Sequence, residues 1–477
     1  MRISPSRQEP GAFSRPTALL VAGAMFMELL DGTALTTAAP RVAAAFGASS
    51  ASIAIPISVY LVTVAAFIPV GGWVVDRFGG RRTFAVALIV FTGASALCAV
   101  SPSLGALVAA RFVQGVGGAL MVPVGRLVVL RGVRRDEVIR AVAFLTWPAL
   151  AAPLLGPVVG GVLATYASWR WIFLLNVPLG ILALCFIRAI PAQTGPRRRL
   201  DVAGFLSCAA CLGCLTAAAA ILSIPGSDPV PAYCCVVATG ISGAVAVRRL
   251  RTAQAPLLGL GALRVRTFVV AHAGGSVFRV VVNAVAFLVP LLFVDEFGWT
   301  PARAGATVVA LFAGNLGIKP VTTPLLRRVG FRTVIRGAVL GSMITTALLA
   351  TLRPDTPIVL TLALLAASGA LRSIGFTAYN TIAFADIEAT MLTDANTLSS
   401  AIQQLAIGLG AAAGALALRL ATGFDPHDTF RPAFILVAAA LAVPLIEAAL
   451  MPHASGRNLT GNKAPPVSDA RQDQTAA

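Results

Sequence analysis

The run AVAFLTWPALAAPLLGPVVGGVLA, residues 141–164, contains no charged residue and is long enough to cross a bilayer as one helix. A hydrocarbon core about 30 Å thick needs roughly 20 apolar residues per helix. Across the 477 residues, 57% are hydrophobic and 12% are charged, and the mean hydropathy is +0.85. An average soluble domain carries about 25% charged residues, so this composition predicts a polytopic membrane protein and not a soluble enzyme.

Similar apolar runs flank this one on both sides. The first of them is too long for a cleaved signal peptide, contains Glu28 and Asp31, and is followed by many more runs. We therefore expect an all-α membrane protein with about fourteen transmembrane helices. The fourteen runs cover residues 17–38, 52–75, 83–101, 105–126, 141–164, 171–190, 202–224, 230–247, 268–293, 304–326, 334–352, 356–380, 396–419 and 431–451.

Positive charges are distributed unequally between the two sides of these runs. Of the 37 Lys and Arg residues, we assign 28 to the side of the two termini, counting Arg372 and the arginines at run ends with the loops, six to the opposite side, and three, Arg111, Arg279 and Lys319, to the interior of runs. Cytoplasmic loops carry such an excess, which predicts cytoplasmic termini, an even number of spans and a place in the bacterial inner (cytoplasmic) membrane. Nucleic-acid binding explains the net charge of +18 less well, because the basic clusters lie between apolar runs and not on one face.

The runs divide into six, two and six. A weak internal echo supports two related blocks, because DRFGGR (76–81) follows the second run of the first block and LRRVGFR (326–332) follows the second run of the last. Two helix blocks around a central cavity are the usual architecture of secondary transporters. The expected units are a cytoplasmic N-terminus (1–16), an N-terminal six-helix bundle (17–190), a two-helix insert with basic cytoplasmic flanks (191–266), a C-terminal six-helix bundle (267–451) and a disordered cytoplasmic tail (452–477).

Glu28 and Asp31 are the two carboxylates inside the first run. Their i, i+3 spacing puts both on one helix face. A charge at the bilayer centre costs about 3 kcal/mol, so it normally has a function or a partner. We predict that Asp31 couples transport to protons and that Glu28 and Arg111, which lies in the fourth run, assist it. The alternative is a structural ion pair between a carboxylate and Arg111.

The turn after the second run is a candidate conformational switch. Gly79 and Gly80 suit a tight turn, and Asp76 can cap a helix or pair with an arginine in one conformation only. Simple anchoring by positive charge is the alternative. The residues that we single out in this turn are Gly72, Asp76, Arg77, Gly79 and Arg81.

The fifth run contains a second candidate switch, PLLGPVVGG at 153–161. Proline removes a helix hydrogen bond and bends the helix, and the glycines allow the bent helix to pack tightly. We single out Gly156, Pro157, Gly160 and Gly161. A merely irregular packing helix is the alternative.

Several polar and charged residues inside or near the runs are candidates for a substrate path. Amides in membrane helices either line such a path or bridge helices, and the sequence leaves both roles open. Lys319, Arg372 and Glu447 are further charges of the last block. The path candidates are Gln114, Trp147, Arg279, Asn283, Asn315 and Asn380.

Two patterns resemble cofactor motifs only superficially. Cys208, Cys211 and Cys214 match part of an iron–sulfur ligand run, but the fourth ligand is missing and the segment is apolar, so helix packing is the better interpretation. The glycines of RFVQGVGG (111–118) lack the preceding strand of a nucleotide-binding fingerprint. We expect no cofactor, no metal and no catalytic residue.

Four motifs in order along the chain resemble the major facilitator superfamily, and more narrowly its fourteen-span drug:proton antiporters. They are LDGTALTTAAP (30–40), GWVVDRFGGRR (72–82), RFVQGVGG (111–118) and GPVVGG (156–161). The stretch WRWIFLLNVPLG (169–180) is also typical of that family. MVPVGR (121–126) and SIGFTAYNT (373–381) are similar to the MdtD-type multidrug transporters.

This resemblance covers nearly the whole chain and implies two six-helix bundles with two extra central helices. It also implies proton-coupled export of small amphipathic compounds, as in multidrug efflux, by alternating access, with Asp31 at the acidic position of the first-span signature. Thr36 replaces the usual Asn, Ala39 replaces Leu, and Glu28 stands where relatives often have an uncharged residue. These departures concern substrate identity and proton stoichiometry and not the fold.

Other functions remain as alternatives. They are dedicated export of one endogenous metabolite or antibiotic, proton-coupled uptake, and a sensor without transport, which would need a soluble signalling domain that is not visible. The expected partners are a small-molecule substrate, protons and the lipid bilayer, without nucleic acid. The sequence leaves the oligomeric state open, with a monomer as the expectation.

Overall fold

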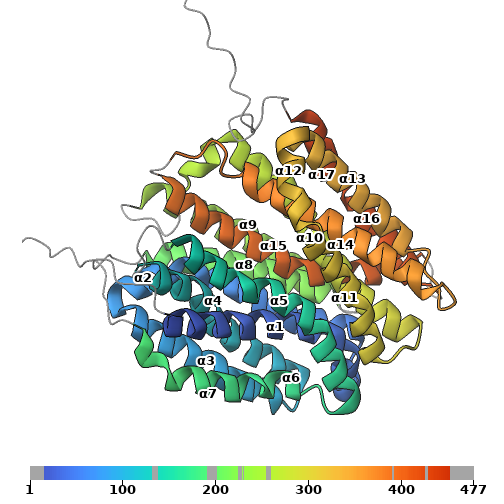
Figure 1. The fold of residues 1–477 in the computed structure, drawn as a ribbon, viewed down its shortest axis with the longest axis horizontal. Coiled ribbons are helices and arrows are strands. Elements are labelled where there is room, and N and C mark those ends of the chain that lie inside the picture. Colours follow the sequence, from blue (N-terminus) through green and yellow to red (C-terminus); the bar gives the residue numbers. More distant parts are fainter. Residues whose placement is uncertain are drawn as a thin grey trace, which may run out of the picture.

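The computed structural model describes residues 15–131, 138–190, 201–223, 228, 230–253, 259–388, 391–424 and 428–451. These residues are almost entirely helical, and none of them forms a strand (Figure 1). The side chains of residues 131–150 lie outside the description, as do the predicted linker 191–200, the tail 452–477 and residues 1–14 of the predicted N-terminus.

The first block of helices follows the first six predicted runs. Helix α1 packs on α5, and α4 packs on both α2 and α3, so Phe84, Phe91 and Met25 are buried between them. The sixth run is interrupted at Leu175 between two short helices. The elements are α1 (Arg15–Phe46), η1 (Ser50–Ile53), α2 (Ala54–Phe78), α3 (Gly80–Ala99), α4 (Leu104–Arg131), α5 (Val138–Tyr166), α6 (Trp171–Leu174), α7 (Asn176–Cys185) and η2 (Ile187–Ala189).

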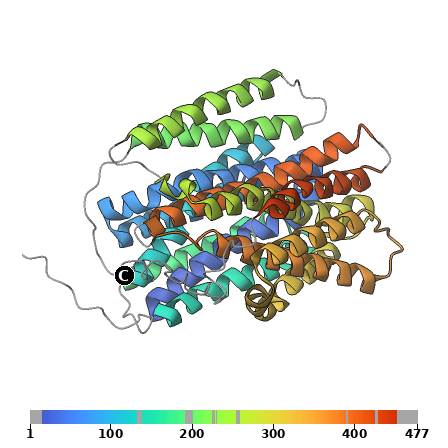
Figure 2. The same ribbon diagram turned by 90° about the horizontal axis from the view of Figure 1, so that it is seen from above.

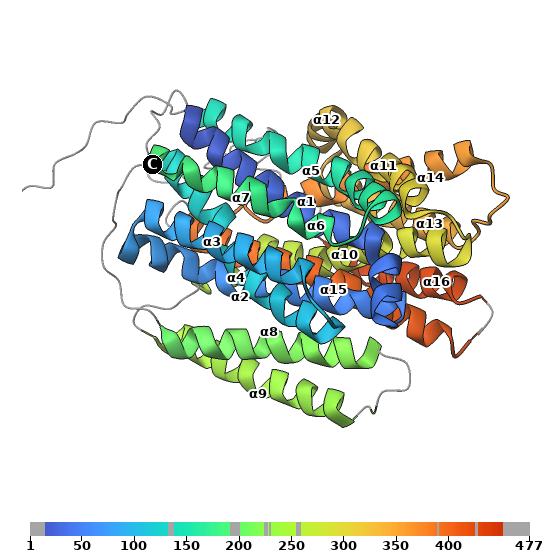
Figure 3. The same cartoon turned by 90° about the horizontal axis from the view of Figure 1, so that it is seen from below.

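Two helices, α8 (Val202–Ser223) and α9 (Val230–Thr252), form a pair at the periphery (Figures 2 and 3). They pack mainly on each other, and α8 also contacts α2 and α15. Most side chains of α9 are not buried, including the large apolar residues Tyr233 and Ile241. An exposed apolar surface of this kind is unfavourable in water and favourable in contact with lipid.

The second block follows the last six predicted runs. Helix α10 packs on α14 and α15, α11 packs on α14, and α13 packs on α14 and α16. The elements are η3 (Gly261–Arg264), α10 (Arg266–Leu291), η4 (Leu292–Glu296), α11 (Pro301–Gly317), α12 (Lys319–Val329), α13 (Phe331–Leu349), α14 (Ile358–Ile382), α15 (Leu392–Ala421), α16 (Phe430–Ala440) and α17 (Ala442–Leu450).

Within the described ranges, 12 helical segments are long and apolar enough to cross a membrane. Two shorter apolar helical segments, Ala151–Tyr166 and Trp171–Cys185, stand where the fifth and sixth runs were predicted. Each of the fourteen predicted runs therefore corresponds to a helix or to a pair of consecutive helices. The predicted fold class is confirmed: the chain is an all-α, multi-pass membrane protein.

The two blocks meet along two pairs of helices, α5 with α11 and α2 with α15. At the first contact the Ala302 amide donates a hydrogen bond to Thr165 Oγ1 over 2.9 Å. At the second, Ser58 Oγ donates to the Gly408 carbonyl over 2.8 Å. Glycines lie at both contacts, Gly161 and Gly305 at the first and Gly408 at the second, which lets the helices approach closely.

Arginines fasten the same kind of turn in both blocks. Arg81, at the start of α3, donates to the Ile190 carbonyl and, over 3.3 Å, to the Arg188 carbonyl beyond α7. Arg336 of α13 donates to the Ala448 carbonyl over 3.1 Å, and Arg332 donates to that of Ala449 over 2.7 Å at the end of α17. Cations are stabilised at the negative C-terminal end of a helix. In each block, the turn that follows the second helical run is therefore hydrogen-bonded to the end of the block's last helical run.

Candidate functional site

Asp31 lies midway along α1 and is 1% exposed. Arg111 Nη1 of α4 forms an ion pair with Asp31 Oδ2. The other carboxylate oxygen, Oδ1, accepts hydrogen bonds from Asn176 Nδ2 over 2.9 Å and from Gln114 Nε2 over 3.2 Å. Three side chains from two other helices therefore donate to this one carboxylate.

The donors to Asp31 are themselves held in place. Gln114 Oε1 accepts from Arg111 Nη1 over 2.7 Å. Ser95 Oγ of α3 accepts from Gln114 Nε2 over 2.8 Å and from Asn176 Nδ2 over 3.3 Å. The side chains of Arg111, Gln114, Ser95 and Asn176 are each at most 1% exposed. These bonds hold Asp31 in one position relative to α3, α4 and α7, while Arg111 Nη2 and Asn176 Oδ1 have no hydrogen-bond partner among the described residues.

An aromatic ring covers the remaining face of the cation. The Arg111 guanidinium lies 4.1 Å from the centroid of the buried Tyr60 ring of α2, and 5.6 Å from that of Phe173. A cation over an aromatic face gains about 0.5–2 kcal/mol. The ion pair is thus enclosed by helices α1, α2, α3, α4 and α7.

Glu28 lies one turn before Asp31 and is 7% exposed. It does not share the ion pair of Asp31 but lies beside Gly118 of α4. A Cβ atom at Gly118 would be 3.3 Å from Glu28 Oε1 and 3.0 Å from the Tyr60 hydroxyl. The sequence predicted that Arg111 would pair with Asp31 or Glu28, and the structure shows that the partner is Asp31.

The glycines of α4 permit this crowding of polar groups. A Cβ atom at Gly115 would lie 2.8 Å from the Tyr60 carbonyl oxygen of α2, and one at Gly117 would lie 2.7 Å from the Phe91 amide nitrogen of α3. Real Cβ atoms essentially never come so close. The RFVQGVGG motif therefore brings α1, α2 and α3 against the helix that carries Arg111.

Sequence reasoning missed three members of this site, Asn176, Ser95 and Tyr60. Asn176 was recognisable as an amide inside an apolar run, a residue type that in membranes seeks a partner. Ser95 carries no comparable signal, because serine hydroxyl groups in helices commonly donate to their own backbone, as Ser95 does to the Phe91 carbonyl. Tyr60 carries none because it is one aromatic residue in an apolar run. Gln114 was predicted as part of a substrate path, and the structure places it in the buried Asp31 network.

The glycines of α5 lie directly against two other helices. A Cβ atom at Gly160 would overlap the Ala34 carbonyl of α1, and one at Gly156 would overlap Thr33 Oγ1. A Cβ atom at Gly161 would overlap the Pro301 carbonyl of α11. In return, Gly305 of α11 lies against the Pro157 carbonyl. The GPVVGG motif thus lies in direct contact with α1 of the same block and with α11 of the second block.

The residues of the predicted switch turn occupy the junction of α2 and α3. Gly79 separates the helices at a φ of +87°, and its amide donates to the Val75 carbonyl over 2.9 Å. Asp76 is half-buried in the last turn of α2, Arg77 is exposed, and Gly72 lies within α2. Gly80 packs on Val128 of α4, because a Cβ atom there would lie 2.6 Å from its Cγ2.

A second polar cluster lies in the C-terminal block. Arg279 Nη2 of α10 donates to Asn380 Oδ1 of α14 over 2.5 Å. Asn283 Nδ2 donates to the Arg279 carbonyl over 2.7 Å, and Asn283 Oδ1 accepts from Arg372 Nη2 over 3.3 Å. Three of the predicted path residues, Arg279, Asn283 and Asn380, are therefore brought together with Arg372.

The two remaining path candidates are elsewhere. Asn315 is half-buried on α11. Its backbone nitrogen would lie 3.1 Å from a Cβ atom at Gly369 of α14. Trp147 belongs to α5, but its side chain is outside the described part. Among the described residues, Asn315 makes no hydrogen bond to the Arg279 cluster.

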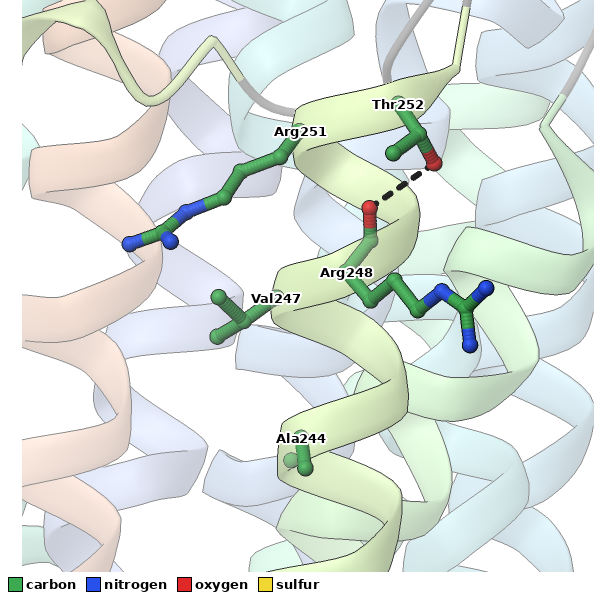
Figure 4. Close-up of a pocket in the computed structure, with 6 residues that line it drawn as sticks. Ala244, Val247, Arg248, Arg251 and Thr252 are labelled. Atoms are coloured by element: carbon green, nitrogen blue, oxygen red, sulfur yellow. Dashed lines mark hydrogen bonds between the residues drawn. The ribbon is translucent and has the colours of Figure 1, made fainter.

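The surface carries hollows that lie away from both polar clusters. One of about 490 Å³ lies beside the end of α9, where Thr252 Oγ1 donates to the Arg248 carbonyl over 2.9 Å and the side chains of Arg248 and Arg251 point to opposite sides of the helix (Figure 4). It is open and lies on the peripheral helix. Among the described residues, no three His, Cys, Asp or Glu side chains gather into a metal site.

Sequence comparison places this architecture in a family. The model described as Major Facilitator Superfamily matches residues 21–415 and, in a second match, 274–459. The chain belongs to the major facilitator superfamily. The resemblance that the four motifs indicated is confirmed, and the protein is a transporter of this superfamily.

Relatives within the superfamily match nearly the whole chain. Three of them, from Cronobacter sakazakii, Escherichia coli O6:H1 and Klebsiella pneumoniae subsp. pneumoniae, share the name "Putative multidrug resistance protein MdtD". They are 33%, 34% and 34% identical to this chain, and each alignment covers 92% of it and 95% of the relative.

Solved structures of the superfamily have the same fold. A D-xylose-proton symporter aligns with a TM-score of 0.67 at 15% identity, covering 94% of this chain and 100% of its own. The POT family transporter PepTSo aligns with a TM-score of 0.65 at 14% identity, with the same coverage. At such identity the likeness concerns the fold alone.

Proposed function

We propose that this transporter exports small amphipathic compounds in exchange for protons by alternating access. The observation that carries the proposal is the ion pair of Asp31 with Arg111, buried inside a spanning helix block. A buried charge in a membrane protein marks a functional site by default. The multidrug-resistance name of the relatives supports amphipathic compounds as the cargo.

Proton binding at Asp31 would change the balance of charge in the first block. The carboxylate is the counter-charge of Arg111, and a buried cation that loses its counter-charge is destabilised by roughly 3–5 kcal/mol. The protonated protein therefore favours an arrangement in which Arg111 finds other partners. This is how one proton shifts the equilibrium between two conformations.

Glu28 is placed to tune this step. It lies one turn from Asp31 on the same helix and close to the Tyr60 ring that covers Arg111. We assign the proton-coupling role to Asp31 and supporting roles to Glu28 and Arg111.

Alternating access requires the two blocks to move against each other. Between the blocks, Gly161 and Pro157 of α5 contact the backbone of α11 without long interlocking side chains, and within the first block Gly156 and Gly160 contact Thr33 and Ala34 of α1. Such a surface can slide or separate without breaking many side-chain bonds. We therefore propose Gly156, Pro157, Gly160 and Gly161 as the moving contact, and the arginine-fastened turn with Gly72, Asp76, Arg77, Gly79 and Arg81 as its cytoplasmic counterpart.

The compound would bind between the blocks, with Arg279, Asn283, Asn380, Asn315 and Trp147 as path candidates, whereas the predicted candidate Gln114 belongs to the buried Asp31 network. The charge distribution of the loops supports an inner-membrane location with both termini in the cytoplasm. Export is then movement from the cytoplasm to the far side of the membrane.

Energised inside-out vesicles test the proposal. A pH-sensitive acridine dye reports the proton gradient, and a panel of amphipathic cations, anions and neutral compounds is added in turn. We expect a subset of the panel to discharge the gradient in vesicles that contain the protein, and not in vesicles that contain the Asp31→Asn variant. If every compound leaves the gradient unchanged while its uptake into the vesicles is nevertheless measured, transport is not proton-coupled.

A further inference from the structure

Two arginines of the C-terminal block lie close to the same aromatic ring, that of Phe376. The guanidinium carbon of Arg279, on α10, lies 5.8 Å from the centroid of the Phe376 ring, and that of Arg372, on α14, lies 5.3 Å from it. Asn283 links the two through its side-chain amide. Both arginines lie near the middle of helices that are long enough to span the membrane.

Neither arginine has an acidic partner among the residues that the structure describes. Arg279 is 1% exposed, and its Nε and Nη1 atoms have no acceptor. The Nε and Nη1 atoms of Arg372 also have none. Glu447 of α17 approaches α10 at Gly274, but it makes no ion pair with Arg279. Guanidinium groups stay charged in proteins, so two positive charges remain here without a counter-charge.

Arg111 in the first block provides the comparison. It is as buried as Arg279, yet it pairs with Asp31 and donates to Gln114 as well. Buried charges in folded proteins are normally paired in this way. The fold thus supplies a carboxylate where an arginine is enclosed, and it supplies none for Arg279 and Arg372 in the described ranges. An anion from outside the chain would complete this second cluster.

The cluster is accessible from one side. Asn380 is exposed, and Arg372, Asn283 and Phe376 are half-buried, whereas Arg279 lies behind them. An accessible surface of arginine and asparagine in a membrane helix faces water and not lipid. A ligand that enters from this side meets Asn380 and Arg372 first and the free edge of Arg279 last.

We infer that Arg279 and Arg372 bind the anionic group, a carboxylate or a similar oxyanion, of the exported compound, and that Phe376 packs on its apolar part. The forked N–H groups of guanidinium match a carboxylate in geometry. The inference rests on the proposed export function and narrows the cargo from amphipathic compounds in general to amphipathic anions.

Three compounds that share a naphthalene ring and carry an anionic, a neutral or a cationic group test the inference. Naphthalene-2-carboxylate, naphthalene-2-carboxamide and 2-naphthyltrimethylammonium are added to the full-length protein in a neutral detergent without lipid, and thermal unfolding is followed. A ligand that binds only the folded state raises the unfolding temperature with its concentration. We expect the carboxylate to stabilise the wild-type protein, and the amide and the ammonium compound to do so at least about tenfold more weakly in apparent affinity. Equal stabilisation by all three compounds would overturn the inference.

Arginine variants locate the effect. Arg279→Gln and Arg372→Gln should each weaken carboxylate binding at least about tenfold, and Arg372→Lys should restore part of it because the charge returns without the fork. Arg303→Gln is the matched control, because Arg303 is an exposed arginine outside the cluster. Its guanidinium carbon lies 3.9 Å from the centroid of the Trp299 ring. If the Gln variants fold poorly, Arg279→Lys and Arg372→Lys serve in their place. Unchanged carboxylate affinity in Arg279 and Arg372 variants that fold would contradict the assignment.

A lipid headgroup offers the same oxyanion chemistry, so a second arm adds phosphatidylglycerol or phosphatidylcholine in bicelles. We expect neither lipid to displace the carboxylate. Arginine-dependent displacement by phosphatidylglycerol would make this a lipid site and overturn the assignment to the exported compound. The vesicle assay distinguishes failure of this inference from failure of the proposed function. Gradient discharge by cations alone overturns the inference and leaves proton-coupled export standing. Carboxylate binding in detergent without gradient discharge by any compound supports the anion site and contradicts proton-coupled export.

Discussion

Gly79 and Gly330 adopt the same backbone conformation at equivalent turns of the two blocks, with φ of 87° and 86° and ψ of 150° and 153°. Each glycine follows the second helical run of its block, and an arginine a few residues later is tied to the block's last helix. The faint sequence echo between the two turns is therefore a repeat in three dimensions. Repeats of this kind are common in transporters.

The repeat predicts a specific cost at Gly330. A Cβ atom there would meet no neighbour within 4 Å, so Gly330→Ala tests backbone strain alone. Its φ of 86° with a ψ of 153° lies in a region that essentially only glycine adopts, at a cost of about 1–3 kcal/mol for other residues, and we expect the free energy of unfolding to fall by about that amount. Gly337→Ala is the control, because that glycine is helical and also meets no atom within 4 Å. Equal unfolding of both variants in a denaturant titration would refute a strained turn.

Gly160 should control conformational exchange more than binding. A side chain at this position overlaps the Ala34 carbonyl and forces α5 away from α1. We expect Gly160→Leu to insert normally yet to lock or leak, which transport and passive proton leak in proteoliposomes measure together. Gly213→Leu on α8 is the control, since a Cβ atom there meets nothing within 4 Å. Wild-type transport by Gly160→Leu would show that the packing argument is wrong.

Asn176 should stabilise the protein through Asp31. Asn176→Leu keeps the size of the side chain and removes its two hydrogen bonds, to Asp31 and to Ser95. We expect a loss of about 1–3 kcal/mol, measured by thermal unfolding in detergent. In combination with Asp31→Asn the two losses should be less than additive, because both changes remove the same contact. Strict additivity would mean that the two side chains do not interact.

The topology follows from charge and can be mapped directly. Reporter fusions after residues 250 and 477 should give cytoplasmic signals, because the basic loops lie on one side. A fusion after Ser168, between α5 and α6, should report the opposite side and serves as the control. A signal from the far side at residue 477, together with a cytoplasmic one at residue 250, would contradict an even number of spans.

Sequence reasoning recovered much of the fold because bilayer thickness and apolar composition determine where helices lie. It also placed Asp31 and Arg111 in one site, since each is a charge that lipid does not tolerate alone. It did not place Asn176 beside Asp31, because the break at Leu175 that starts α7 there is a tertiary feature. It likewise left Arg372 a lone charge, since only the packing of α10 on α14 brings Arg279 near it.

The proton-carrying role of Asp31 is the central claim, and a comparison of two modes of transport in proteoliposomes tests it most directly. The labelled compound is the one that gives the largest discharge in vesicles. Counterflow exchange needs no net proton movement, whereas accumulation driven by an imposed pH gradient does. Asp31→Asn should retain counterflow and lose gradient-driven accumulation, and Glu28→Gln should keep accumulation with an altered dependence on pH. Full gradient-driven accumulation by Asp31→Asn would contradict the account and move the coupling site elsewhere, with Glu28 as the next residue to test.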